Sequence, residues 1–490
     1  MHMQRKAKFH LNKATQESDS IKQNIEFMVM AAQSRKGFNF RCNDDEEQTR
    51  TGYSCSKMDQ LSFISNARLG SRAATYFTNS CGEFDYINDI WGYESAISNK
   101  KYAIAELWDG TSFVDISGRN PIVVGFLERT GDIEVGDCNS GFWADVKVVG
   151  GHAYIGSEQK NSGIQIFDLA RLDSLPRPTS PQPLTRGEVP RLEADAFIAT
   201  IGALHNFIEF PELGQLLAVG YGKVDNTAAC SVDDGETVAI FDVSVDPLNP
   251  TVDCLNLGTL LNTENRAPYA LMNTYPGYVH DGQCFIYNGP DTTYAGVAMC
   301  IFFAETEIGI YDMSNREMIN TFTYTGATYV HQGWVSTDFA TLYANDENDE
   351  ECRSGHLDHC IDLNDPKALP STRIFDITDL KNIDAPREFI NNKVHPSIDH
   401  NMYVRGDYIY SANYEAGARV YKIQEDKSLV EVAYFDVSND CDNIIECADP
   451  YGGVWTHYPY SDMSTTIASN GFYGLHIFRV RLELHENIFQ

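Results

Sequence analysis

Histidine and aspartate recur at one position of a pattern that is repeated along this 490-residue chain. Imidazole nitrogens and carboxylate oxygens are common ligands of zinc, iron and copper in proteins, so such a set can hold a transition metal. The same side chains can instead bond to the next repeat and tie neighbouring strands together, and this structural interpretation is the simpler one. With the repeats aligned on their first strands, the position is occupied by Asp89, Asp145, His205, His280, His331, His400 and, by a weaker match, His457.

An acidic segment, NDENDEE over Asn345–Glu351, offers a second kind of chemistry. Closely spaced carboxylates suit a hard cation such as calcium. The segment lacks the glycine and the terminal glutamate spacing of an EF-hand loop, and a run of acids is often only a solvated loop. The candidate calcium ligands are Asp346, Glu347, Asp349 and Glu350.

The elements that must position these side chains repeat along the chain, and the third strand of each repeat is the clearest marker. It occurs as TSFVDIS (Thr111–Ser117), IQIFDLA (Ile164–Ala170), VAIFDVS (Val238–Ser244), IGIYDMS (Ile308–Ser314) and TRIFDIT (Thr372–Thr378), with weaker copies at ARVYKIQ (Ala418–Gln424) and LHIFRV (Leu475–Val480). A four-strand unit that recurs seven times, at roughly 60 residues per copy, is typical of a β-propeller. The sequence therefore predicts an all-β, seven-bladed β-propeller of four-stranded antiparallel blades. The first strands would line its channel and bring the histidines and aspartates into a ring. We expect Glu158, Glu305, Asp346 and Asn413 to approach the same mouth of the channel.

The acids that end several third strands have a structural interpretation. Asp115, Asp242, Asp312 and Asp376 are each followed two residues later by Ser or Thr. A carboxylate in that position accepts hydrogen bonds from nearby backbone N–H groups and closes a turn. We therefore expect these four aspartates to be turn residues and not catalytic acids.

The propeller is expected to cover residues 55–482, with repeats that begin near residues 89, 143, 204, 279, 330, 399 and 454. Residues 1–54 would form an extension with a helix over 13–36 and a cysteine-tied loop, and residues 483–490 a short tail. The last repeat has one strand too few. The segment QLSFIS (Gln60–Ser65) has the character to supply that strand and so to join the two ends of the ring.

Composition points to the extracellular space. The net charge of −32 repels phosphate backbones and anionic lipid, which argues against nucleic acid and membrane surfaces as partners. Twelve cysteines, several in close pairs and none in a CxxC motif, favour disulfide bonds over zinc knuckles. The close pairs are Cys42/Cys55, Cys284/Cys300, Cys352/Cys360 and Cys441/Cys447. The sequence has no apolar run of membrane-spanning or signal-peptide length, and we expect the natural start to lie upstream.

Several long motifs, in order along the chain, resemble one known family. They are DIWGYES (Asp89–Ser95), FWADVKVVGGHAYIGSEQKNSGIQIFDL (Phe142–Leu169), HDGQCFIYNGPDTTYAG (His280–Gly296), YVHQGWVSTDFATLYANDENDE (Tyr329–Glu350) and IDHNMYVRGDYIYSANYEAGARVYKI (Ile398–Ile423). Over about Cys55 to Val480 the chain is similar to the choice-of-anchor B family, whose repeats are also called LVIVD repeats. That resemblance implies a surface or secreted β-propeller without a defined biochemical activity. The end of the chain, RVRLELHENIFQ, lacks the sorting motif or hydrophobic tail of an anchor.

Three functions remain open at the level of sequence, the third of which is a calcium-stabilised scaffold with no discrete ligand site. The preferred one is a monomeric, non-enzymatic extracellular protein that binds a protein, a glycan or a small molecule. The alternative is a metal-dependent hydrolase or oxidoreductase with its site at the His/Asp ring. No GxSxG, GxxxxGK[ST], HExxH or GxGxxG motif indicates another chemistry.

Overall fold

The computed structural model of the chain describes most of the repeat region. The described residues are 40–45, 47–49, 53–72, 86–131, 143–176, 189–221, 230–261, 276–348, 371–391, 397–437 and 452–482. The helix expected over residues 13–36 and the tail expected over 483–490 lie outside these ranges. Within them, no helix combines the length and the apolar character needed to cross a membrane.

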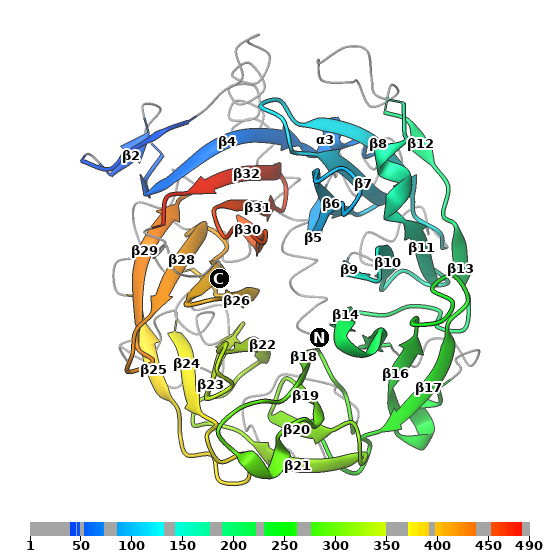
Figure 1. Cartoon of the computed structure of the whole chain (residues 1–490), viewed down its shortest axis with the longest axis vertical. Helices are drawn as coiled ribbons and strands as arrows, with labels where there is room; N and C mark the ends of the chain where they lie inside the picture. Colours follow the sequence, from blue (N-terminus) through cyan, green and yellow to red (C-terminus); the bar gives the residue numbers. More distant parts are fainter. Residues whose placement is uncertain are drawn as a thin grey trace, which may run out of the picture.

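Seven β-sheets stand around a central axis like the blades of a propeller (Figure 1). The innermost strand of each sheet contacts the innermost strands of both neighbouring sheets, and the sequence of contacts β5, β9, β14, β18, β22, β26, β30 returns to β5. The prediction of a seven-bladed propeller with four-stranded antiparallel blades is confirmed.

Each blade runs from an innermost to an outermost strand with antiparallel pairing. Blade one consists of β5 (Ile87–Glu94), β6 (Lys101–Leu107), β7 (Gly110–Asp115) and β8 (Ile122–Glu128). Blade two consists of β9 (Ala144–Val149), β10 (His152–Ser157), β11 (Ile164–Asp168) and β13 (Ala196–Ile198). Blade three consists of β14 (Asn206–Phe210), β15 (Gln215–Val219), β16 (Glu236–Asp242) and β17 (Thr251–Asn256). Blade four consists of β18 (Asp281–Ile286), β19 (Ala298–Phe303), β20 (Ile308–Asp312) and β21 (Glu317–Phe322).

The remaining blades follow the same plan, except that the last one takes a strand from the start of the chain. Blade five consists of β22 (Val330–Val335), β23 (Thr341–Asp346), β24 (Ser371–Asp376) and β25 (Arg387–Ile390). Blade six consists of β26 (Met402–Arg405), β27 (Tyr408–Ala412), β28 (Ala418–Ile423) and β29 (Leu429–Phe435). Blade seven consists of β30 (Val454–Pro459), β31 (Thr465–Asn470), β32 (Gly474–Val480) and β4 (Met58–Ser65).

Short elements decorate the blades. Strand β12 (Arg191–Leu192) adds to β8 in parallel, β3 (Cys55–Ser56) adds to β29, and β1 (Cys42–Asn43) pairs with β2 (Gln48–Thr49). The helical turns are α3 (Asn66–Leu69), η1 (Leu169–Asp173), η2 (Pro211–Leu213), η3 (Val232–Asp234) and η4 (Thr292–Tyr294).

The core lies between adjacent blades, because both faces of most blade strands are covered by the neighbouring sheets. Every residue of β19, AMCIFF, is buried. Cys300 and Phe302 belong to a cluster shared with blade three, whereas Met299 and Ile301 belong to one shared with blade five. This explains why the strands are continuous apolar runs and do not alternate with polar residues.

The aspartates that end the third strands close turns, as predicted. Asp115 accepts a hydrogen bond from the backbone N–H of Ser117, at 2.9 Å. Asp242 accepts from both the backbone and the hydroxyl of Ser244, and these bonds lower the pKa of Asp242. Asp376 has the corresponding two bonds to Thr378. Asp312 differs, since it accepts from the backbone and the side chain of Asn315.

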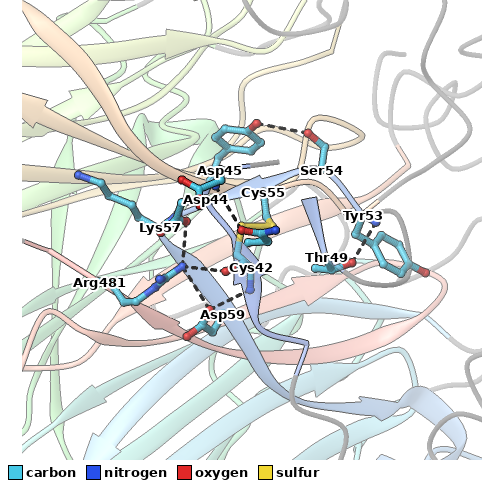
Figure 2. Close-up of a disulfide and its surroundings, with 12 residues drawn as sticks. Cys42, Asp44, Asp45, Thr49, Tyr53, Ser54, Cys55, Lys57, Asp59 and Arg481 are labelled. Atoms are coloured by element: carbon cyan, nitrogen blue, oxygen red, sulfur yellow. Dashed lines mark hydrogen bonds and ion pairs between the residues drawn. A yellow bond between two sulfur atoms is a disulfide. The ribbon is translucent and has the colours of Figure 1, made fainter. Parts of the chain in front are cut away.

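The ring closes where the start of the chain meets its end. The segment Gln60–Ser65 lies in β4, which pairs antiparallel with the whole of β32. Figure 2 shows how the adjoining N-terminal segment is held: Arg481, just past β32, contacts Asp44 at 2.9 Å and Asp59 at 3.4 Å, and Asp59 accepts from the backbone N–H of Cys42 at 3.0 Å. Residues more than 420 positions apart thus stabilise one seam.

Disulfide bonds join three pairs of described cysteines. Cys42–Cys55 and Cys284–Cys300 are the pairs that sequence proximity predicted, whereas Cys230–Cys254 was not foreseen. The expected pairs Cys352/Cys360 and Cys441/Cys447 lie outside the described residues. Cys284 and Cys300 face each other directly across β18 and β19, so sheet register brings them together.

Candidate functional site

A chain of aromatic and imidazole rings lies where the innermost strands begin. The ring centroids of His205 and His280 are 4.5 Å apart, with the rings tilted at 50°, and those of His280 and His331 are separated by the same distance. His331 and His400 lie 4.3 Å apart, as do His400 and Trp455. Trp143 continues the series at 4.7 Å from Trp455. Four of the predicted histidines therefore meet on the axis.

Three ligating side chains converge within this chain: His331, Glu347 and His400. One nitrogen or oxygen of each lies within 4.8 Å of the other two, and all three residues are buried. His400 Nε2 is 3.4 Å from Glu347 Oε1, and His331 Nε2 is 3.8 Å from Glu347 Oε2. Metal bonds of about 2.0–2.2 Å at tetrahedral angles place two ligand atoms roughly 3.3–3.6 Å apart. The cluster thus needs only small rotations to enclose a transition metal.

The surrounding groups orient these ligands. The backbone carbonyl of Trp455 accepts a hydrogen bond from His400 Nδ1 at 2.7 Å, which leaves the Nε2 lone pair facing Glu347 in the neutral ring. Tyr414 donates its hydroxyl to Glu347 Oε1 at 2.7 Å. The Glu347 backbone N–H donates to the carbonyl of Tyr329. Partners of this kind fix ligand orientation at metal centres.

His280 and His205 extend the cluster towards solvent. His280 Nδ1 donates to the carbonyl of His331 at 3.0 Å, so its Nε2 accepts the 2.9 Å hydrogen bond from His205 Nε2. Burial lowers the pKa of His280 well below its ordinary value, and the neighbouring His331 and His205 lower it further, so the ring is neutral at pH 7. His205 Nδ1 lies 2.7 Å from Glu158 Oε1, whose side chain is 32% exposed. Glu158 was expected near this mouth, and it reaches His205.

The described residues of the acidic segment have two different structural roles. Asp346 accepts hydrogen bonds from the Tyr324 hydroxyl and from the backbone of Thr328, Tyr329 and Asn348, so its carboxylate caps the turn beside β22. Glu347, one residue later, faces His331 and His400. Asp349 and Glu350 lie outside the described residues. The carboxylates of Asp346 and Glu347 have separate partners, so the described part of the segment does not bring these two expected calcium ligands together.

The structure does not bring the two aspartates of the expected ring, or His457, together with the histidine cluster. Asp89 and Asp145 both contact Lys147, with Nζ 2.9 Å from Asp89 Oδ2 and 2.6 Å from Asp145 Oδ1. Tryptophans Trp143 and Trp455 hold the corresponding places beside the histidines. His457 is buried within the blades, where its Nε2 lies 2.9 Å from the Thr466 hydroxyl. The alignment was shifted by two residues in blades two and seven.

Lys147 is the residue that sequence reasoning missed. Its ammonium lies between Asp89 and Asp145 and 4.7 Å from the centre of the Trp91 ring. Although burial lowers the pKa of Lys147, these carboxylates outweigh that effect and raise it well above its ordinary value. The only sequence feature from which its role could have been predicted is a lone lysine in the buried strand β9.

The other residues expected near the mouth serve the scaffold. Asn413 donates to Asp399 within blade six. The Glu305 backbone N–H donates to the carbonyl of Val330 and so links blades four and five. Burial raises the pKa of Glu305 to about 8, so its carboxyl is mostly protonated at pH 7.

Comparison with known proteins assigns no family to the chain. No model of a known protein family matches the chain, and no curated protein matches it. Among solved structures, it is similar to the β-propeller domain of Cps50 (Swd1) from Myceliophteria thermophila, with 9% sequence identity and a TM-score of 0.43 over 78% of this chain and 94% of that one. The blade count rests on the strand pairing described above. The protein is a β-propeller, and membership of the choice-of-anchor B family stays a proposal.

Proposed function

We propose that this protein is an extracellular β-propeller that binds one divalent transition-metal ion through His331, Glu347 and His400. The observation that carries the proposal is the convergence of their three buried ligand atoms within 4.8 Å. Two imidazoles and one carboxylate suit zinc or iron(II) better than calcium, which prefers six to eight oxygens.

Three protein ligands leave at least one coordination position for a further ligand. Closed structural zinc sites use four protein ligands, whereas sites at which the metal meets water or substrate use three. The arrangement therefore favours the metal-dependent alternative over a propeller that binds partners by its surface alone. The metal would polarise the ligand that completes its coordination.

The extracellular location is part of the same proposal. Three described disulfides are typical of proteins from an oxidising compartment. The resemblance to the choice-of-anchor B family points the same way, and two of the motifs that carry it contain His331, Glu347 and His400.

Metal analysis of the purified protein tests the proposal. The wild-type protein, loaded with zinc or iron(II) and freed of excess by gel filtration, is expected to hold one ion per chain. The double variant His331→Ala, His400→Ala is expected to hold none. His457→Gln, which changes a buried histidine with a hydroxyl partner in blade seven, is the matched control and should retain the ion.

Three results would overturn the assignment. They are wild-type protein that retains no transition metal, protein that retains calcium alone, and a double variant that keeps the full metal content. Circular dichroism of each variant shows that a loss of metal is not a loss of fold.

A further inference from the structure

A cavity of about 300 Å³ opens at the other end of the innermost strands. Its walls come from the ends of β14 and β22, from the middle of β18, from η2, and from β26. The metal ligands His331 and His400 begin or precede β22 and β26, and the cavity residues on these two strands follow three or more positions later. At about 3.3 Å per residue, the cavity and the metal ligands are separated by roughly 10 Å or more along the axis.

The lining combines negative charge with aromatic surface. Glu209 and Glu212 supply two carboxylates, and Trp334, Phe285 and Phe339 supply rings. No lysine or arginine is among the described residues that line the cavity. Trp334 is fixed by an edge-to-face contact with Tyr403, with centroids 5.2 Å apart.

The same channel already shows how this set of groups holds an ammonium ion. The Lys147 ammonium lies between two carboxylates and 4.7 Å from the Trp91 ring. Trp91 contacts Tyr403, and Tyr403 contacts Trp334, so one tyrosine ring links the occupied cage to an aromatic side chain of the cavity. Carboxylates and tryptophan faces together form the usual cage for alkylated ammonium groups.

We propose that this cavity binds a small organic cation, with its ammonium group against Glu209 and the face of Trp334. Burial raises the pKa of the Glu209 carboxyl to about 7, so a bound cation would also stabilise its ionised form. The volume suits a ligand of a few heavy atoms and excludes a folded partner. This inference is independent of the metal, because none of the metal ligands lines the cavity.

Titration calorimetry of the full-length protein with choline tests the inference, and 3,3-dimethylbutanol serves as its uncharged isostere. Choline is expected to bind at one site, at least 10-fold more tightly than the isostere, since the ring and the carboxylates select for charge. Glu209→Gln and Trp334→Leu are each expected to weaken binding about 10-fold or more. Glu212→Gln, at an exposed position, should weaken it less and cannot disturb the fold.

Glu388→Gln is the matched control, since Glu388 is exposed on β25 and outside the cavity. It should leave choline affinity unchanged. The proposal is overturned if choline gives no saturable heat at millimolar concentration, or if the isostere binds equally well. Equal affinity in wild type, Glu209→Gln and Trp334→Leu would also overturn it, as would calcium that displaces choline by binding the carboxylates more tightly.

Discussion

The central channel holds two clusters of different composition: in one, two histidines and a glutamate face one another, and in the other two aspartates face a lysine. Both clusters sit on innermost strands, or directly beside them, and both are buried. The difference is the source of the cation, because Lys147 is supplied by the chain, whereas His331, Glu347 and His400 need an ion from outside. The lysine cluster is therefore a fixed part of the fold, and the histidine cluster is a site whose state depends on its surroundings.

Removal of the internal cation is expected to have the largest effect. Lys147→Met leaves Asp89 and Asp145 buried without their counter-ion, which should lower the free energy of unfolding by about 3–5 kcal/mol. Guanidinium denaturation measures the loss. The control is Lys101→Met, which breaks a partly exposed pair with Asp462 and should cost under about 1 kcal/mol. Equal losses in the two variants would show that Lys147 is not the structural cation of the channel.

Removal of the external cation should have the next largest effect. Metal present at 100 times its dissociation constant adds about 2.7 kcal/mol to stability, which a chelator should abolish. We expect chelation to lower the melting temperature of wild-type protein and of His457→Gln, and to leave His331→Ala, His400→Ala unchanged. A chelator effect that persists in the double variant would place the stabilising metal elsewhere.

Repetition explains why the fold was predictable. Runs such as VAIFDVS and IGIYDMS occur once in each blade. A strand that is buried on both faces consists of a continuous run of apolar residues. The closing strand over Gln60–Ser65 was predictable because the last repeat had one strand too few. The Cys230–Cys254 bond was not, since its partners are 24 residues apart and no spacing rule selects them.

The site was predictable only in part, for reasons of register. His331 was placed correctly on the axis, but a bulge between Val330 and Gln332 and a similar one near Thr456 change which side chains face inward. The bulge near Thr456 explains why a fixed alignment of the repeats failed at His457, whereas at Asp145 the alignment failed although β9 pairs with β10 in regular register. Nor can sequence distinguish Asp346 from Glu347, because the partners that separate them come from distant segments.

The Tyr414 hydroxyl allows a further test of metal binding at the histidine cluster. Tyr414→Phe removes the hydrogen bond to Glu347 and should lower metal affinity about 10–100-fold without removing a ligand. Competition with a chromophoric chelator measures the affinity. Tyr410→Phe is the control, because the Tyr410 hydroxyl donates to the carbonyl of Met463 and should affect stability alone. If both variants bound metal as wild type does, Tyr414 would be a packing residue only.

The smallest predicted effect is the pH dependence of stability that arises from two carboxyls near Lys147. Burial raises the pKa of both Glu209 and Asp281 to about 7. A carboxyl whose pKa is raised in the folded state binds protons more tightly there than in the unfolded chain. Its contribution to the free energy of unfolding therefore falls as pH rises from about 4.5 to about 7, and is constant above that range.

Between pH 5 and pH 8, the free energy of unfolding of the double variant Glu209→Gln, Asp281→Asn should decrease by about 1 kcal/mol less than that of wild type. The difference is modest because both side chains border the channel and are partly hydrated. Glu106 and Glu305, whose pKa values burial raises to about 7 and about 8, retain their own pH dependence in the variant. Urea denaturation at several pH values measures the difference, with Glu388→Gln as the exposed control. A profile identical to that of wild type would mean that Glu209 and Asp281 titrate as they do in the unfolded chain. In that case Lys147 would be neutralised by Asp89 and Asp145 alone.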